Sequence, residues 1–155
     1  MRSFVMTKSE FLKLIDEQKA ENKYEMFSPC EDFDLLDSKP QFKTNLPDEL
    51  TQLLKETNGL QVYYSLSIWS LDAIISNNLS YWFDSESFAD LYMPFDNLLF
   101  FADAGNGDLF AYRILQHKIE YNDIYLWNHE NDSRVWVANN LTDFIKQSLT
   151  GEINF

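Results

Sequence analysis

The residue types that most often carry catalysis are scarce in this chain and are poorly spaced for it. Its two histidines, His117 and His129, show neither a metal-ligand spacing nor a spacing to a nucleophile that a histidine base would use. The single cysteine, Cys30, is followed by Glu31, and acidic neighbours disfavour a reactive thiolate. These residues predict no catalytic site. A reactive thiol at Cys30 is the alternative to an inert, buried one.

Paired carboxylates are too abundant here to indicate acid–base catalysis. The segment Asp103-Ala-Gly-Asn-Gly-Asp108 superficially resembles a calcium-binding loop. It lacks the alternating oxygen ligands and the final glutamate of that motif, and a hairpin turn at Asn106-Gly107 explains the same residues. The chain also lacks the glycine patterns of P-loops and of dinucleotide-binding sites. The sequence therefore predicts a protein that is not an enzyme and has no catalytic residues, metal or cofactor.

Acidic residues dominate the middle of the chain. Of the net charge of −13, residues 56–112 contribute −8, because they contain eight acidic residues and no Lys, Arg or His. Residues 1–55 contribute −3 and residues 113–155 contribute −2. Such a field repels phosphate backbones and anionic lipid and favours a basic partner. The charge predicts no nucleic-acid or membrane partner; acidity that only maintains solubility is the alternative explanation.

Within this acidic stretch, residues 80–96 interleave aromatic and acidic side chains. Aromatic rings could stack on nucleic acid, but such a surface needs accompanying Lys and Arg, and this stretch has none. A protein partner fits better, with charge steering the encounter and aromatic burial supplying affinity. The alternative is a solvated loop with a few core aromatics. The predicted partner-binding residues are Tyr81, Trp82, Asp84, Glu86, Asp90 and Asp96.

Length and composition predict a single domain over residues 1–155. The apolar fraction of 45% and the aromatic fraction of 16% are too high for a disordered chain. One cysteine cannot form an internal disulfide. The N-terminal residues lack the apolar run of a signal peptide, and no segment is apolar for long enough to span a membrane. We therefore expect a cytoplasmic protein.

The periodicity of apolar residues predicts helices at both ends of a strand-rich middle. A first helix is expected to begin at Thr7, followed by an irregular acidic connection over residues 28–45. A second helix is expected from Pro47 to a left-handed stop at Asn58-Gly59. Ser70 is expected to cap a short helix through Ile75, and Asn140 to cap the last helix. This order predicts an α+β fold with a mainly antiparallel, multi-stranded sheet flanked by helices.

Residues 98–114 give the clearest strand signal. Two apolar runs flank Asn106-Gly107, and a two-residue turn there would pair Asp103 with Phe110, Phe101 with Tyr112 and Phe100 with Arg113. Because both faces of this hairpin are apolar, we expect it in the middle of the sheet, covered on both sides. Further strands are expected over residues 61–68, 123–128 and 134–138.

Four sequence landmarks in this order resemble the SUKH superfamily, the Smi/Knr-type domain, over about residues 45–150. They are Leu46-Pro47-Asp48-Glu49-Leu50 running to Asn58-Gly59; Ile68-Trp69-Ser70-Leu71-Asp72; Phe100-Phe101-Ala102-Asp103 with Asn106-Gly107-Asp108; and Val137-Ala138-Asn139-Asn140-Leu141 with Phe144-Ile145. The resemblance implies a SUKH-like α+β domain without a shared catalytic set. The aromatic insertion at 80–96 departs from the family pattern, and partner specificity is expected in such a variable element.

The resemblance also implies a function. Most such domains are immunity proteins, or antitoxins, that bind and neutralise a cognate polymorphic toxin, and those toxins are often nucleases. A nuclease surface is basic because it must hold phosphates, so an acidic inhibitor can block it. The alternative is a regulatory protein-interaction module of the Smi/Knr cell-wall signalling type, although those relatives usually carry disordered extensions.

Overall fold

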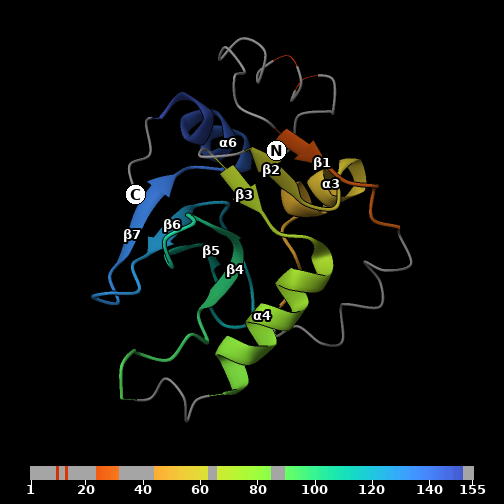
Figure 1. Ribbon diagram of the computed structural model, residues 1–155. Coiled ribbons are helices and arrows are strands. Elements are labelled where there is room, and N and C mark those ends of the chain that lie inside the picture. Colours follow the sequence, from red (N-terminus) through yellow and green to blue (C-terminus); the bar gives the residue numbers. More distant parts are fainter. Residues whose placement is uncertain are drawn as a thin grey trace.

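The protein folds around a seven-stranded, entirely antiparallel sheet in which the strands lie in chain order. The computed structural model describes residues 10, 13, 24–31, 44–62, 66–84 and 90–151 (Figure 1). The strands are β1 (Tyr24–Met26), β2 (Leu60–Val62), β3 (Leu66–Ile68), β4 (Leu98–Asp103), β5 (Leu109–Arg113), β6 (Ile124–Trp127) and β7 (Arg134–Ala138). The helices are α3 (Asp48–Glu56), α4 (Leu71–Phe83) and α6 (Leu141–Thr150). The predicted α+β fold is confirmed. The helix expected from Thr7 and most of the acidic connection over 28–45 lie outside the described residues.

The central hairpin lies where the sequence predicted it. Its strand register differs from the predicted one. Strands β4 and β5 occupy the fourth and fifth positions of the sheet and are buried on both faces, as predicted. The predicted two-residue turn is wrong, because Asp103 pairs with Leu109, Phe100 with Ala111 and Leu98 with Arg113. Two side-chain hydrogen bonds lengthen the loop. The Gly105 amide donates to Asp103 Oδ1 (3.0 Å), and the Asp108 amide donates to Asn106 Oδ1 (2.9 Å).

A bulge in β4 shifts the pairing between Phe100 and Ala102. The carbonyl of Phe101, which sits in this bulge, accepts a hydrogen bond from the Trp69 amide at 2.9 Å. The bulge therefore leaves the backbone satisfied while the flanking Phe side chains reach opposite faces of the sheet. Phe100 contacts Tyr81 of α4 and Phe101 contacts Phe144 of α6.

The single strand predicted over residues 61–68 is wrong. Strands β2 and β3 form an antiparallel pair in which Leu60 pairs with Ile68 and Val62 with Leu66. Both are buried at alternate positions, so one face of this hairpin packs on the core. The two short strands share the same β-forming residue types, and periodicity alone does not separate them from one longer strand.

The helix caps agree closely with the sequence analysis. Ser70 accepts a hydrogen bond from the Ala73 amide at the start of α4, and Asn140 accepts one from the Asp143 amide at the start of α6. Pro47 immediately precedes α3 as its N-cap, and Gly59 has a positive φ of 103° after that helix. The helix predicted to end at Ile75 continues to Phe83, because Asn78 and Trp82 extend its buried face.

The helices cover both faces of the sheet (Figure 1). Helix α4 packs against β4 on one face. On the other face, Phe144 of α6 contacts Phe101 and Phe110, and Glu49 of α3 bonds to Tyr112 of β5. Within the described part of the chain, every helix is too short or too polar to cross a membrane.

Asn78 joins α4 to the bulged strand. Its amide nitrogen donates to the carbonyls of Ile74 (2.7 Å) and Phe100 (2.8 Å), and its Oδ1 accepts from the Phe100 amide (2.8 Å). The side chain is fully buried. The asparagine side chain thus satisfies both backbone polar groups of Phe100 beside the bulge, which the fold could not leave unsatisfied.

We predict that Asn78→Ala lowers the free energy of unfolding by about 2–4 kcal/mol, because it orphans buried groups of Phe100. Urea denaturation measures the change. Asn77→Ala, at the neighbouring partly exposed position of the same helix, is the matched control and should cost about 1 kcal/mol or less. Equal costs for the two variants would contradict the role given to Asn78.

A second prediction concerns the β4–β5 loop. Gly107 has φ of 103°, and a Cβ there would lie 2.9 Å from the His129 ring. Gly107→Val should therefore destabilise the fold by about 1–3 kcal/mol. Gly105 also has a positive φ (85°) but open space around it, so Gly105→Val isolates the backbone strain. Thermal melts should rank Gly107→Val as the less stable variant; the reverse order would refute the His129 contact.

Candidate partner-binding surface

The predicted partner-binding segment begins at the end of α4 and returns to the sheet through residues 90–97. Asp84 is the C-cap of α4, and its amide donates to the Ser80 carbonyl at 2.9 Å. Asp84, Asp90 and Asp96 are exposed. Glu86 lies outside the described residues. The described acidic positions are therefore on the surface, as a partner-binding role requires.

Tyr81 and Trp82, by contrast, point into the fold. The Tyr81 ring lies 5.1 Å from Phe95, 5.0 Å from Phe100 and 6.1 Å from Trp127, between ring centroids. Burial raises the pKa of the Tyr81 hydroxyl. Trp82 is 5% exposed, and its Nε1 donates to the Leu98 carbonyl at 2.8 Å. Both rings position the segment; Trp82 is buried and Tyr81 is partly exposed.

A cluster of edge-to-face aromatic rings joins residues 90–97 to β6. Trp127 of β6 lies 5.0 Å from Tyr92 and 5.2 Å from Phe95, between centroids. The Tyr92 hydroxyl also donates to the His129 carbonyl at 2.8 Å. Such ring pairs contribute roughly 0.5–1.5 kcal/mol each beyond the area they bury. The segment is thereby fixed to β6 and to the turn that follows it.

Asp132 and Arg134 fasten the same segment with polar contacts. Asp132 accepts from the Met93 amide (2.9 Å), from Trp127 Nε1 (2.7 Å) and from Arg134 (3.1 Å). Burial raises the pKa of the Asp132 carboxyl, but these hydrogen bonds and the Arg134 charge outweigh it and lower the pKa.

The guanidinium of Arg134 makes further polar contacts to this segment. It donates to the carbonyls of Met93 (3.1 Å) and Pro94 (3.2 Å) and to Asn97 Oδ1 (3.2 Å). It also lies 5.2 Å from the centroid of the Phe95 ring. Residues 90–97 therefore have one well-determined backbone position relative to β6 and β7.

The exposed side of this segment combines acids with large apolar side chains. Phe83 is 64% exposed, Leu91 69% and Met93 59%. We call residues 83–84 and 90–97 the acidic ledge. The sequence did not single out Leu91 and Met93, because nothing in their spacing distinguishes an exposed apolar residue from a core one.

The residue types that most often carry catalysis, here His129 and Cys30, lie at separate sites. His129 Nδ1 is 2.6 Å from Asp108 Oδ1, and the His129 amide donates to the same oxygen at 3.0 Å. Burial raises the pKa of the Asp108 carboxyl, but the bonds to His129 outweigh it and lower the pKa. This pair ties the β4–β5 loop to the β6–β7 turn. Cys30 is buried, and its amide donates to the Leu54 carbonyl.

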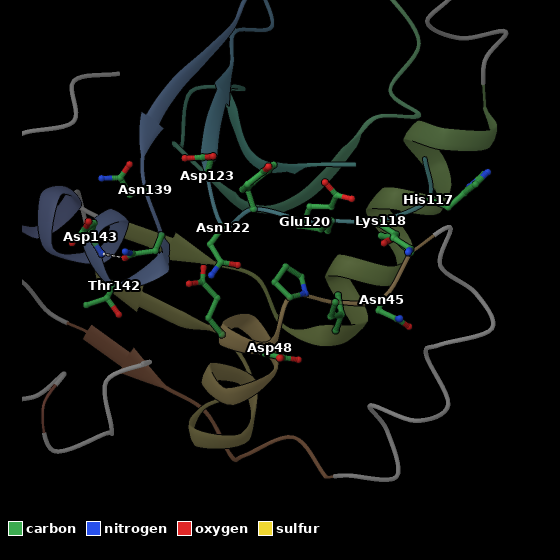
Figure 2. A pocket seen from close by; sticks show the side chains of 17 residues that line it. Asn45, Asp48, His117, Lys118, Glu120, Asn122, Asp123, Asn139, Thr142 and Asp143 are labelled. Carbon is green, nitrogen blue, oxygen red and sulfur yellow. Dashed lines mark hydrogen bonds between the residues drawn. The ribbon is translucent and has the colours of Figure 1, made fainter. Parts of the chain in front are cut away.

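A polar cleft of about 980 Å³ lies where α3 and α6 begin (Figure 2). His117 and Asp143 lie at opposite ends of it in the view of Figure 2, so its charged groups do not converge on one point. Within the described residues, no three His, Cys, Asp or Glu side chains gather as a metal site would require.

The rim of the cleft contains a tight turn with unusual backbone angles. Leu115 and Lys118 exchange two backbone hydrogen bonds (2.8 and 3.0 Å), and the two residues between them, Gln116 and His117, have φ of 50° and 65°. Asn and Gly are the residues that adopt this conformation readily. His117 therefore lies at the tip of a tight turn.

Glu49 forms the floor of the cleft and joins three elements. Its Oε2 accepts from the Tyr112 hydroxyl (2.7 Å) and from the Leu141 amide (2.8 Å) at the start of α6. Burial raises the pKa of the Glu49 carboxyl and the Asp143 charge adds to this, while the bonds to Tyr112 and Leu141 oppose it; the pKa is raised. Burial and the nearby Glu49 charge also raise the pKa of Tyr112.

The chain matches the SMI1-KNR4 cell-wall family (SUKH_6) over residues 37–145. It therefore belongs to this family within the SUKH superfamily, and the resemblance found in the sequence is confirmed. No curated protein sequence matches the chain. Domains of this superfamily are generally immunity or interaction modules rather than enzymes. The match thus directs attention to protein-binding surfaces.

The raised pKa of Glu49 gives a pH prediction. As pH rises above the ordinary value of 4.5, the unfolded carboxyl loses its proton before the folded one, so Glu49 makes the fold less stable with rising pH. Glu49→Gln keeps an acceptor for Tyr112 and Leu141 but does not titrate. Its stability relative to the native chain should therefore increase between about pH 4 and about pH 7. Urea denaturation across that range is the measurement, and a constant difference would contradict the burial of a charged carboxylate.

Proposed function

We propose that this protein is a cytoplasmic immunity protein that binds a cognate toxin through the acidic ledge and neutralises it. The observation that carries the proposal is the ledge itself, which places Asp84, Asp90 and Asp96 beside exposed Phe83, Leu91 and Met93. Membership of the SMI1-KNR4 family supports a binding role without catalysis or cofactor. We infer that the toxin is a basic nuclease domain, because acidic groups would then occupy the surface that holds phosphates.

The rigidity of the ledge also supports this function. A binding segment that is already ordered loses less conformational entropy when the complex forms. The ring cluster around Trp127 and the contacts of Arg134 provide that order. The acids would speed the encounter with a basic surface, and the exposed apolar side chains would lose contact with water in the complex.

The family description supports a second candidate, a regulatory protein-interaction module of cell-wall signalling, because it names the cell wall. The two functions differ in their partner. An immunity protein should rescue cells that express the toxin domain encoded by the neighbouring gene, whereas a signalling module should not. Rescue without an effect on cell-wall phenotypes would favour immunity.

The ledge is tested by the double reversal Asp90→Lys with Asp96→Lys. It should lower the association rate constant with the basic domain encoded by the neighbouring gene by about tenfold at low ionic strength, and by less at high salt, where charges are screened. Stopped-flow or surface-plasmon kinetics at two salt concentrations measure the effect. A thermal melt of each variant verifies that it is folded.

The matched control reverses two exposed acids on and after β1, Glu25→Lys with Glu31→Lys. It changes the net charge equally but leaves the ledge intact. The proposal expects a clearly smaller effect from the control pair. Equal slowing by both pairs would mean that total charge, and not the ledge, governs association; absence of any binding or rescue would refute the immunity function.

A further inference from the structure

One area of the sheet is open on the face that carries α4. Helix α4 packs against β4 on the side of the sheet away from β7 (Figure 1). Further along this face, Tyr125 of β6 pairs with Ala111 of β5 and with Trp136 of β7. Trp136 is 48% exposed, and Arg113, two residues from Ala111, is exposed as well. Tyr125 is partly exposed. We call these three side chains the Trp136 face: Arg113, Tyr125 and Trp136.

The side chains of the Trp136 face are held in place although Trp136 and Arg113 are exposed. Trp136 Nε1 donates to Asp123 Oδ1 at 3.0 Å, and the Arg113 guanidinium lies 5.9 Å from the centroid of the Tyr125 ring. The other three tryptophans of the chain are enclosed to a greater degree: Trp82 and Trp127 are 5% and 3% exposed, and Trp69 is half-buried with its Nε1 bonded to Asp103. Trp, Tyr and Arg are the residue types that most often dominate binding energy at interfaces.

The Trp136 face and the acidic ledge are joined through one residue. Arg134 precedes Trp136 by two positions on β7, so both side chains lie on the same face of that strand. The guanidinium of Arg134 bonds to the carbonyls of Met93 and Pro94 in the ledge. A partner that covers Met93 and Arg134 therefore also reaches the exposed ring of Trp136, two residues further along β7.

The charges around these residues indicate what kind of partner fits. Exposed Asp90 and Asp96 lie on the ledge, and Asp123, with neighbouring exposed Glu120, lies at the other end of the Trp136 face. Arg113, against the Tyr125 ring, is an exposed base of the Trp136 face. A second copy of the chain would bring together two molecules of net charge −13, which repel each other. The charges therefore favour a basic protein surface over self-association.

We propose that Trp136 is the apolar anchor of the docking surface for a basic protein domain, with the acidic ledge as one rim and Asp123 as the other. This inference rests on the proposed function and deepens it: the ledge steers the partner, and the Trp136 face retains it. The energetic centre of the interface is therefore on β7 and not on the aromatic residues of α4.

The test compares two substitutions on one strand, with the full chain and the purified toxin domain encoded by the neighbouring gene as the probe. Trp136→Ala should raise the dissociation rate constant at least tenfold. Val135→Ala, at a side chain that is 56% exposed on the opposite face of β7, should change it less than twofold. Melting temperatures of both variants show whether they remain folded.

Hydroxyl-radical footprinting of the unmodified chain is an independent readout, which holds even if Trp136→Ala does not fold. Trp136 should be oxidised in the free protein and protected in the complex. Binding that tolerates Trp136→Ala and leaves Trp136 reactive would overturn this inference while the immunity function stands. Equal weakening by Trp136→Ala and Val135→Ala would also overturn it, because that result indicates pairing along the strand edge. A native chain that does not bind the toxin domain would refute both proposals.

Discussion

The whole fold depends on the requirement that both faces of β4 and β5 be covered. These two central strands are apolar on each side, and leaving either face in water would forfeit the burial of Phe100 and Phe110 or their neighbours. Helix α4 therefore lies on one face, with α3 and α6 on the other. A polar side chain fixes the helices on each side: Asn78 bonds to the backbone of β4, and Glu49 bonds to Tyr112 and to the first turn of α6.

The position of the candidate interface follows from this arrangement. Helix α4 covers β4 and ends at Phe83, and the chain crosses back along residues 90–97 to the start of β4 at Leu98. The returning residues 90–97 rest on Trp127 and are fastened by Asp132 and Arg134. The same crossing leaves the far end of this sheet face to Tyr125 and Trp136. One structural solution thus produces both an ordered acidic ledge and an exposed aromatic face beside it.

Local signals made much of the fold predictable from the sequence. Ser70 and Asn140 cap their helices as expected, because a cap depends on only three or four consecutive residues. The hairpin register was not predictable in this way. The side chains of Asp103 and Asn106 bond to the loop backbone and lengthen the turn, and this competes with the two-residue turn that Asn-Gly favours.

The candidate site was predictable only in part, because the sequence shows charge but not the direction of a side chain. The exposed Asp90 and Asp96 could be located from charge, whereas the inward direction of Trp82 could not. Asn78 interrupts the apolar stripe formed by Leu71, Ile74 and Trp82, so the sequence pattern predicts a helix that is too short. Likewise, the run Arg134–Ala138 does not show which of its apolar residues face water. The exposure of Trp136 depends on what packs against β7, which is a tertiary property.

Amide hydrogen exchange of the whole chain, free and mixed with the basic domain that we propose as its partner, tests the central claim most directly. The account predicts slower exchange in the complex at residues 90–97 and 134–138, and unchanged exchange at residues 24–31 on the opposite side of the sheet. Protection confined to residues 24–31, or to the cleft residues 117–120, with none at 90–97 and 134–138, would contradict it.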